Sequence, residues 1–241
     1  MTLLLDMGNS RLKWAWRPTT GALCVQSAPY EGADAWPAAW AALAVPGAVW
    51  AIASAADRIA AMNAYCARRW QQVPRWFTAC ADGHGVRNLY MPPEALGADR
   101  YAALVGARAH YAAPLCVVDC GTAITVDALD GGGVFRGGAI LPGLRSAMAG
   151  LHARVGHLPP ADKTTMSGAL GLSTPAALAA GSILGTAGAI THLVNQQSRG
   201  LGGVTHVLLT GGDAQFLAPY LEFSAKIVED LTLQGLLVMA T

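Results

Sequence analysis

The feature that most constrains this sequence is a motif that occurs twice, half a chain apart. Residues 3–10 read Leu-Leu-Leu-Asp-Met-Gly-Asn-Ser, and residues 116–123 read Cys-Val-Val-Asp-Cys-Gly-Thr-Ala. Both copies are an apolar run followed by Asp-x-Gly and a residue with an amide or hydroxyl side chain. Because Asp6 and Asp119 lie almost half of the 241 residues apart, the repeat predicts two similar halves with the same kind of turn in each. We place these halves at residues 1–112 and 113–241.

Each copy of the motif opens a β-hairpin. Residues 11–17 and 123–129 alternate polar and apolar side chains at the period of a strand that returns from the turn. Residues 130–133 read Asp-Gly-Gly-Gly, a turn that needs the freedom of glycine, and a further strand is expected at 134–141. Apolar spacing predicts helices at 56–70, 97–111, 143–155 and 174–195, and a last strand at 204–209. Strands and helices alternate in both halves, which predicts an α/β fold with a mixed sheet in each half.

Composition limits the classes of function. Hydrophobic residues make up 53% of the chain and charged residues 13%, which predicts a compact globular protein with a large core. Sixteen basic residues against 15 acidic ones leave no positive field to hold nucleic acid. The opening Met-Thr-Leu-Leu-Leu-Asp lacks the basic segment of a secretory signal, so we expect a cytoplasmic protein. Five cysteines without a Cys-x-x-Cys pair favour reduced thiols over disulfides or a zinc site.

One segment, residues 175–194, is apolar and long enough to span a membrane. Its side chains are mostly those of alanine and glycine, with several hydroxyl groups between them, so little apolar area would be gained in lipid. We interpret it as a buried helix and expect no association with membranes. Gly181 and Gly185 in this segment have the spacing that permits close helix contact, either within the fold or across a dimer.

The paired Asp-x-Gly turns indicate phosphate binding. The chain lacks the P-loop, the dinucleotide-binding glycine motif, the nucleophile elbow, the zinc-protease helix motif and the protein-kinase signatures. A glycine after the acid lets the backbone approach a ligand, and the amides that follow can bind phosphate oxygens beside a cation held by the acid. One Asp-Gly turn alone is commonly an ordinary turn. Two such turns, facing each other across a cleft, are expected of an ATP-using enzyme.

The segment from Tyr90 to Tyr101 is the second informative one. It reads Tyr-Met-Pro-Pro-Glu-Ala-Leu-Gly-Ala-Asp-Arg-Tyr and sets Asp99 and Arg100 side by side at the start of a predicted helix. This pair could supply a general base and a fixed cation near Tyr90. Asp99 could equally be a helix cap and Arg100 a solvated side chain, and the local sequence leaves both interpretations open.

Taken together, the motifs resemble the type III pantothenate kinases over essentially the whole chain. The matching segments, in that family's order and spacing, are Asp6-Met7-Gly8-Asn9-Ser10, Gly97-Ala98-Asp99-Arg100, Asp119-Cys120-Gly121-Thr122-Ala123, Gly138 to Gly143, and Thr210-Gly211-Gly212-Asp213. The resemblance implies an actin-like fold of two similar halves, shared with sugar kinases and acetate kinase. It also implies a homodimer that phosphorylates pantothenate in the first step of coenzyme A synthesis, with ATP, Mg²⁺ and a monovalent cation, K⁺ or NH₄⁺.

The resemblance further implies roles for individual residues. The first ATP-binding segment would be Asp6, Met7, Gly8, Asn9, Ser10, Arg11, Leu12 and Lys13, with Asp6 nearest Mg²⁺ and Thr122 as a second contact. Pantothenate would contact Tyr90, Gly97, Ala98, Asp99, Arg100 and Thr174, with Asp99 as the general base. Asp119 would hold the monovalent cation, and the turn at Asp213 would lie beside the adenosine. Ser10 stands where threonine is more usual, and Ile124 replaces a hydroxyl residue common in the family.

Two other functions are compatible with such a fold. Another small-molecule kinase of the superfamily, acting on a sugar or a carboxylate, would keep the phosphate turns, although Gly97-Ala98-Asp99-Arg100 argues against it. A catalytically weak regulatory or binding protein would be expected to have damaged motifs, whereas Asp6, Asp99, Arg100 and Thr122 are present. The six histidines show no ligand or triad spacing, and the seven tryptophans, all in the first half, are interpreted as packing.

Overall fold

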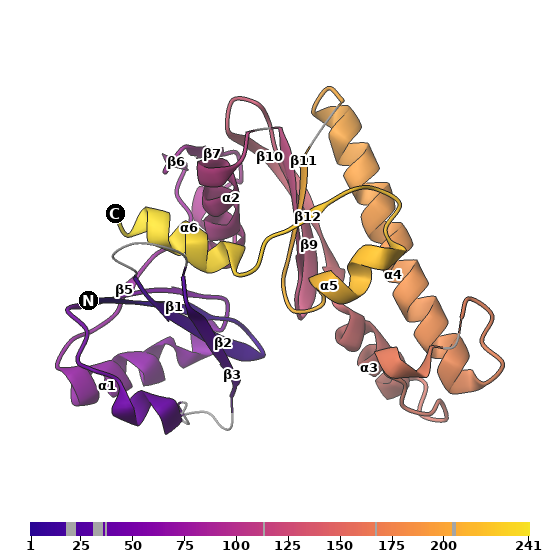
Figure 1. The fold of residues 1–241 in the computed structure, drawn as a ribbon, viewed down its shortest axis with the longest axis horizontal. Coiled ribbons are helices and arrows are strands. Elements are labelled where there is room, and N and C mark those ends of the chain that lie inside the picture. Colours follow the sequence, from indigo (N-terminus) through magenta and orange to yellow (C-terminus); the bar gives the residue numbers. More distant parts are fainter. Residues whose placement is uncertain (18–22, 31–35, 37, 113, 167, 204–205) are drawn as a thin grey trace. The chain divides into compact units, whose positions relative to one another are not determined.

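The computed structural model describes residues 1–17, 23–30, 36, 38–112, 114–166, 168–203 and 206–241. It divides into two compact units, which are described separately (Figure 1). Unit 1 comprises Met1–Tyr111 and Asp230–Thr241, and unit 2 comprises Ala112–Glu229. The sequence-based division instead kept all of residues 113–241 in the second half, and Ala113 itself lies outside the described residues. The final segment returns to unit 1 because its helix is apolar on nearly every side and is buried there.

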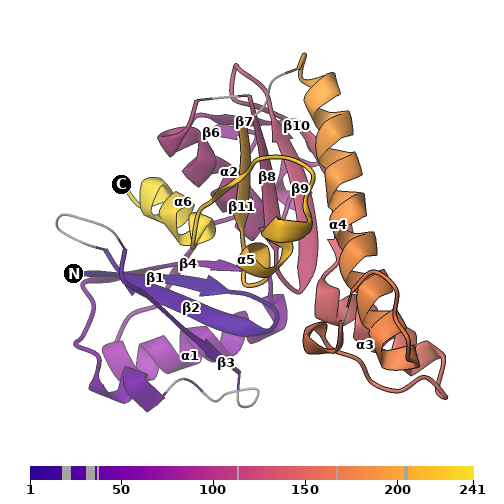
Figure 2. The same ribbon diagram turned by 45° about the vertical axis from the view of Figure 1, so that its right-hand side comes forward.

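Unit 1 is built on a five-stranded sheet in the order β3-β2-β1-β4-β5. Its strands are β1 Thr2–Met7, β2 Arg11–Trp16, β3 Val25–Pro29, β4 Ala48–Ala53 and β5 Arg75–Trp76. The central strand β1 is antiparallel to β2 and parallel to β4. Helix α1 (Ile59–Trp70) lies on one face of the sheet, and α2 (Ala98–His110) and α6 (Leu231–Met239) lie on the other (Figures 1 and 2). Because helices cover both faces, β1 is buried from Leu3 to Met7.

Short elements complete unit 1. They are the 3-10 helices η1 Ala38–Ala42, η2 Ala56–Arg58 and η3 Pro93–Ala95, and the strands β6 Asp82–Gly83 and β7 Val86–Asn88, which pair with each other. The helix expected at residues 56–70 therefore begins as a 3-10 turn and continues as α1. The helix expected at 97–111 is confirmed as α2, with Gly97 as its N-cap residue.

Tryptophans fill the core between the unit 1 sheet and α1, as the packing interpretation predicted. Trp40 is fully buried, with its ring centroid 5.6 Å from those of both Trp14 and Trp70 and 5.7 Å from that of Tyr65. The indole N–H groups of Trp40 and Trp70 are buried without a hydrogen-bond partner among the described residues. Such aromatic contacts add to the free energy gained from area burial alone.

The contact between α2 and α6 depends on two glycines. A Cβ atom on Gly235 would lie 1.7 Å from the carbonyl oxygen of Ala102, and one on Gly106 would lie 2.6 Å from that of Leu231. The two backbones can therefore touch only because neither position carries a side chain. This contact joins α6 to α2, the helix that carries Asp99 in its first turn.

The strands of unit 2 lie in the order β12-β11-β8-β9-β10. They are β8 Leu115–Cys120, β9 Ala123–Leu129, β10 Val134–Pro142, β11 His206–Thr210 and β12 Lys226–Ile227. Residues 204–205 of the strand expected at 204–209 lie outside the described residues. The helices of unit 2 are α3 Leu144–Arg154, η4 Lys163–Thr165, α4 Thr174–Gly200, α5 Ala214–Leu217 and η5 Ala218–Tyr220.

The two units share one strand plan, as the repeated motif predicted. In unit 2 the central strand β8 is antiparallel to β9 and parallel to β11, just as β1 is antiparallel to β2 and parallel to β4. The outer pairs also match: β10 is antiparallel to β9 as β3 is to β2, and β12 is parallel to β11 as β5 is to β4. Both Asp-x-Gly motifs therefore join a central strand to its antiparallel neighbour.

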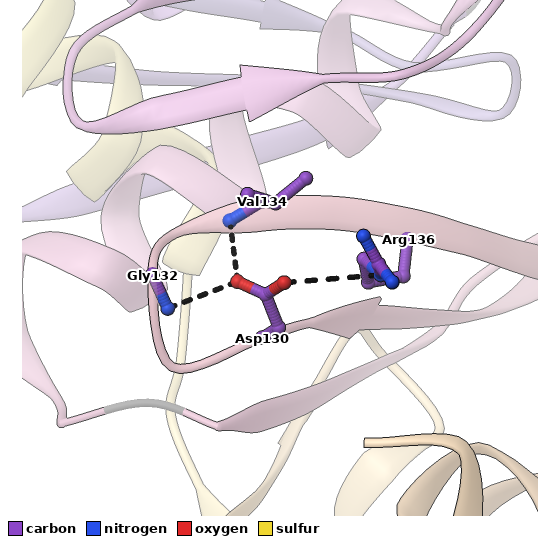
Figure 3. A network of polar contacts seen from close by, with 4 residues as sticks. All are labelled: Asp130, Gly132, Val134 and Arg136. Carbon is purple, nitrogen blue, oxygen red and sulfur yellow. Dashed lines mark hydrogen bonds and ion pairs between the residues drawn. The ribbon is translucent and has the colours of Figure 1, made fainter.

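The β9–β10 turn shows how sequence fixes a hairpin. Asp130 Oδ1 accepts hydrogen bonds at 2.9 Å from the backbone N–H groups of Gly132 and Val134, and its other oxygen lies 3.8 Å from Arg136 Nε (Figure 3). Gly133 has φ +79, a left-handed conformation that favours glycine. The turn expected at residues 130–133 is confirmed.

Helix α4 is buried on one face only. Its 27 residues contribute Ile183, Ile190 and Val194 to unit 2 cores. Within the described residues it has the length and apolar composition of a membrane span, although 39% of its most apolar window is buried inside the protein. The expected buried helix is thus a core helix with an exposed second face that includes Gly181, Gly185 and Gly188.

Candidate functional site

The first Asp-x-Gly turn presents an acid and a base on neighbouring strands. Asp6 on β1 pairs with Lys13 on β2 in the antiparallel register, and directly opposed side chains of such a pair lie close together on one face. Asp6 is only 8% exposed. Lys13 Nζ lies 3.1 Å from Asp230 Oδ1, at the start of α6. A Cβ atom on Gly8 would lie 3.1 Å from the carbonyl oxygen of Arg11, so the turn is tight.

The remaining residues of the predicted ATP-binding segment divide into two groups. Asn9, Ser10 and Arg11 are exposed around the turn. The side chains of Met7 and Leu12 are buried in the core beside the tryptophans, so they stabilise the hairpin and only their backbone groups could face a nucleotide. The division follows the hairpin, because the exposed residues lie in the turn and at the first position of β2, whereas Met7 and Leu12 lie in the paired strands over the core.

The second Asp-x-Gly turn is packed against two other segments of unit 2. A Cβ atom on Gly143 would lie 2.2 Å from the carbonyl oxygen of Gly121, and one on Gly211 would lie 2.4 Å from Asp119 Oδ1. Thr122 has an exposed side chain, and its carbonyl accepts hydrogen bonds from Gly143 N at 3.0 Å and Ser146 Oγ at 2.7 Å. These contacts explain why glycine stands at residues 143 and 211 in the matching segments.

The turn after β11 completes this region of unit 2. The N–H of Asp213 donates to the carbonyl of Cys120 at 3.0 Å, and the Asp213 carboxylate lies 3.1 Å from Lys163 Nζ. Gly211 has φ +90, which lets the chain reverse directly beside Asp119. Three segments far apart in sequence therefore meet at one corner of unit 2. Ile124, in contrast, is buried in the unit 2 core.

In unit 1, Arg100 contacts Tyr90, and Asp99 precedes Arg100 in the first turn of α2. Asp99 Oδ1 accepts the backbone N–H of Arg100 at 2.8 Å, and Asp99 Oδ2 accepts the hydroxyl of Ser54 at 2.6 Å. Arg100 is only 8% exposed, and its Nη1 donates to the Tyr90 hydroxyl at 3.2 Å. Asp99 is therefore not the helix cap, which is Gly97, and Arg100 is not a solvated side chain. The Asp99 carboxylate instead accepts one hydrogen bond within the first turn of α2 and one from Ser54.

Tyr90 is itself held in place. Its backbone N–H donates to Asn88 Oδ1 at 2.9 Å, while Asn88 Nδ2 donates to the carbonyl of Pro93 at 2.8 Å. Gly97 and Ala98 lie at the start of α2 in the same unit. Thr174, the remaining predicted pantothenate contact, lies in unit 2 as the first residue of α4.

Three residues in these surroundings were not singled out in the sequence: Ser54, Asn88 and Asp230. Ser54 is a hydroxyl residue directly after the end of β4, and this signal could have found it. Asn88 and Asp230 carry no comparable local signal, since their partners lie at sites that only the folded chain defines.

The carboxylate of Asp6 is a candidate ligand for the Mg²⁺ of a magnesium nucleotide. No group of three or more His, Cys, Asp or Glu side chains that could hold a metal occurs in the parts of the chain that the structure describes. Mg²⁺ commonly takes one or two carboxylates and completes its octahedron with water and substrate phosphates. The buried carboxylate of Asp6, beside Lys13, is compatible with that arrangement.

Two units with one strand plan, each with an Asp-x-Gly turn at its central strand, define the actin-like class of ATP-using proteins. The sequence model of the type III pantothenate kinase family matches residues 2–196. Relatives described as type III pantothenate kinases include one from Azoarcus sp., 37% identical over 100% of this chain and 90% of its own length, and one from Polaromonas sp., 35% identical over 99% and 97%. The chain belongs to the type III pantothenate kinase family, ATP-dependent kinases of coenzyme A biosynthesis.

Solved structures confirm the actin-like fold. A Campylobacter jejuni protein assigned to the Baf family of transcriptional activators matches with a TM-score of 0.59 and 22% identity over 99% of this chain and 98% of its own. A 2-dehydro-3-deoxygalactonokinase from Sinorhizobium meliloti matches with a TM-score of 0.53 and 16% identity over 100% and 98%. At these identities the likeness concerns the fold alone.

Proposed function

We propose that this protein transfers the γ-phosphoryl group of ATP to the primary hydroxyl of pantothenate, with Asp99 as the general base. The hydroxyl oxygen forms a bond to the γ-phosphorus, the bond from that phosphorus to the bridging oxygen breaks, and ADP leaves. The proton of the hydroxyl passes to Asp99. The observation that carries this proposal is the Asp99 carboxylate, held by two hydrogen bonds beside the buried Arg100, which donates to the Tyr90 hydroxyl.

The proposed roles follow from charge. Arg100 is a buried cation that suits the carboxylate of pantothenate, with Gly97, Ala98, Tyr90 and Thr174 as further substrate contacts. Asp6 would hold Mg²⁺, which spreads the charge of the transferring phosphoryl group. Lys13 and the backbone of the first turn would bind phosphate oxygens, with Thr122 as the contact from the second turn.

The decisive experiment compares ATP consumption with pantothenate and with a panel of sugars and small acids, for the wild-type protein and for Asp99→Asn. We expect turnover only with pantothenate, and a fall in kcat of roughly 10²- to 10⁴-fold in the variant, because asparagine cannot accept the proton. Equal ATP consumption with and without pantothenate would refute the proposed substrate. Near-normal kcat with a raised KM for pantothenate would reduce Asp99 to a binding residue.

A monovalent cation, K⁺ or NH₄⁺, is proposed to bind at Asp119. The support is the position of this carboxylate, packed against Gly211 at the same turn as Thr122. Replacing K⁺ by Na⁺ should depress kcat sharply, and unchanged rates in both salts would remove Asp119 from this role.

A homodimer formed through α4 is also proposed, acting in the cytoplasm. The support is the exposed small-residue face of α4 and a groove that Gly181 and Gly185 line together with Leu141, Pro142 and Ala147. Small residues allow close approach of two helices. Light scattering should report twice the chain mass, and Gly185→Leu should lower it; an active wild-type monomer would refute the assembly.

A further inference from the structure

We propose that Ser54 is a positioning residue that holds the Asp99 carboxylate in its working orientation, an inference that rests on the proposed role of Asp99. Ser54 Oγ donates to Asp99 Oδ2 at 2.6 Å, although 45 positions separate the two residues. The distance of 2.6 Å between the two oxygens is typical of a hydroxyl that donates to a carboxylate in a charge-assisted hydrogen bond, the stronger class of protein hydrogen bond. A residue outside the matching motifs therefore contacts the proposed base directly.

The backbone of Ser54 is rigidly placed. Ser54 follows the last residue of β4, whose Ala53 pairs with Met7 at the end of β1. The N–H groups of Ser54 and Ala55 both donate to the carbonyl oxygen of Met7, at 2.9 and 3.1 Å. The hydroxyl that contacts Asp99 is thus fixed to the strand that carries Asp6, so Ser54 links the first phosphate turn to the proposed base.

The two oxygens of the Asp99 carboxylate have different partners, and Ser54 contacts Oδ2. Asp99 Oδ1 is occupied by the N–H of Arg100 at 2.8 Å, and a Cβ atom on Gly97 would lie 2.6 Å from the same oxygen. The bond from the Arg100 N–H restrains only the Oδ1 side of the carboxylate. Ser54 restrains Oδ2, and because a carboxylate oxygen has a second lone pair, Oδ2 can still accept the substrate proton.

The fold alone does not require a hydroxyl at this place. In unit 2 the strand β11 corresponds to β4, with Thr210 paired to Asp119 as Ile52 is paired to Asp6. Counting two residues on from each pair, Gly212 is the counterpart of Ser54, and it has no side chain. The same arrangement of strands therefore forms in unit 2 without this hydrogen bond. This favours a role for the Ser54 hydroxyl in the reaction over a role in folding.

The test uses Ser54→Ala and Ser54→Cys, with Ser54→Thr as the conservative variant. Alanine removes the hydroxyl, cysteine keeps a similar volume with a poor donor, and threonine keeps the hydroxyl. We expect kcat to fall about tenfold in the alanine and cysteine variants, because small misplacements of a catalytic group are costly. We expect the KM for pantothenate and the urea midpoint to stay near the wild-type values, and threonine to restore most of kcat.

A double variant separates action through Asp99 from a general effect. If Ser54 acts only by holding Asp99, adding Ser54→Ala to Asp99→Asn should lower kcat no further. Ser198→Ala, which removes a hydroxyl bonded to the Gly203 carbonyl at the end of α4, is the matched control and should leave kcat unchanged.

The outcomes distinguish this inference from the proposed function. Wild-type kcat in both Ser54→Ala and Ser54→Cys, with Asp99→Asn impaired, would overturn the inference and leave the proposed base intact. A fall in kcat that threonine does not restore, or one that adds fully to Asp99→Asn, would also overturn it. Normal kcat in Asp99→Asn would refute the proposed base, and the role of Ser54 would fall with it.

Discussion

Gly235→Ala should unfold unit 1 more easily, because α2 and α6 touch at this residue. The new Cβ atom would lie 1.7 Å from the carbonyl oxygen of Ala102 and 2.6 Å from its carbonyl carbon. Both are backbone atoms of a helix, so no side chain can rotate away. To bring this Cβ atom to an ordinary contact distance, α2 and α6 would have to move apart by about 1.5 Å. The substitution therefore overpacks the contact between the two helices.

Two opposing effects set the magnitude. Alanine is favoured over glycine inside a helix by about 1 kcal/mol. Overpacking typically costs 1 to 3 kcal/mol, and a clash with backbone belongs at about the upper end of that range. The steric effect therefore wins, and we expect a net loss of about 2 kcal/mol, a large share of the roughly 5 to 15 kcal/mol that stabilises a typical domain.

Urea unfolding followed by tryptophan fluorescence is the appropriate assay. All seven tryptophans lie between residues 14 and 76, within unit 1, so the signal reports on this unit. The midpoint should fall by about 1 M for an m value near 2 kcal/mol/M. The control is Gly150→Ala, inside α3 of unit 2, where nothing outside its own helix lies within 4 Å of the new Cβ atom. Because the tryptophans do not report on unit 2, its urea midpoint is read by far-UV circular dichroism, and it should be unchanged or slightly raised. An unchanged or raised midpoint in Gly235→Ala would refute the steric argument.

Three further predictions concern Arg100, Asp230 and the buried thiols. Arg100→Ala should raise the KM for pantothenate more than it lowers kcat, and an unchanged KM in steady-state assays would exclude Arg100 from substrate binding. Asp230 has φ +53, a left-handed conformation that alanine adopts less readily than glycine. Asp230→Ala and Asp230→Gly both lose the Lys13 ion pair, so we expect the alanine variant to be less stable by about 1 kcal/mol and to have the lower urea midpoint. Equal midpoints would contradict a left-handed backbone at this residue. Burial raises the pKa of the thiols of Cys66, Cys116 and Cys120 to about 12, so these should resist thiol reagents at pH 8 in the native protein and react in urea, and fast native labelling of all five cysteines would contradict this burial. Because these thiols ionise near pH 9 when unfolded, the stability from burying them is present below pH 9 and should be lost as the pH rises toward 12, visible as a falling urea midpoint.

Local patterns predicted those parts of the fold that local interactions determine. The repeated Asp-x-Gly motif predicted the two hairpins, and the polar and apolar alternation over residues 11–17 predicted the returning strand β2. Turn chemistry at Asp130 predicted the β9–β10 connection because its hydrogen bonds span four residues or fewer.

Contacts between distant segments could not be predicted in the same way. The bond from Ser54 to Asp99 arises because β4 ends beside the start of α2, and no local pattern encodes that meeting. The final helix was assigned to the wrong half because apolar residues on every side indicate burial without indicating a partner. The glycines at 106 and 235 specify that partner, but only the paired backbones reveal their purpose.

The return of α6 to unit 1 gives synthesis an unusual order. The ribosome makes residues 1–111 first, yet helix α2 lacks its packing partner until residues 231–239 exist. All of unit 2 is made in between, which takes roughly 10 s at ordinary rates of elongation. Unit 2 is continuous in sequence, so it can fold while still attached to the ribosome, before the unit that precedes it. For that interval the apolar surface of α2 is an exposed target for chaperones, and the first part of this chain to be made is the last to be completed.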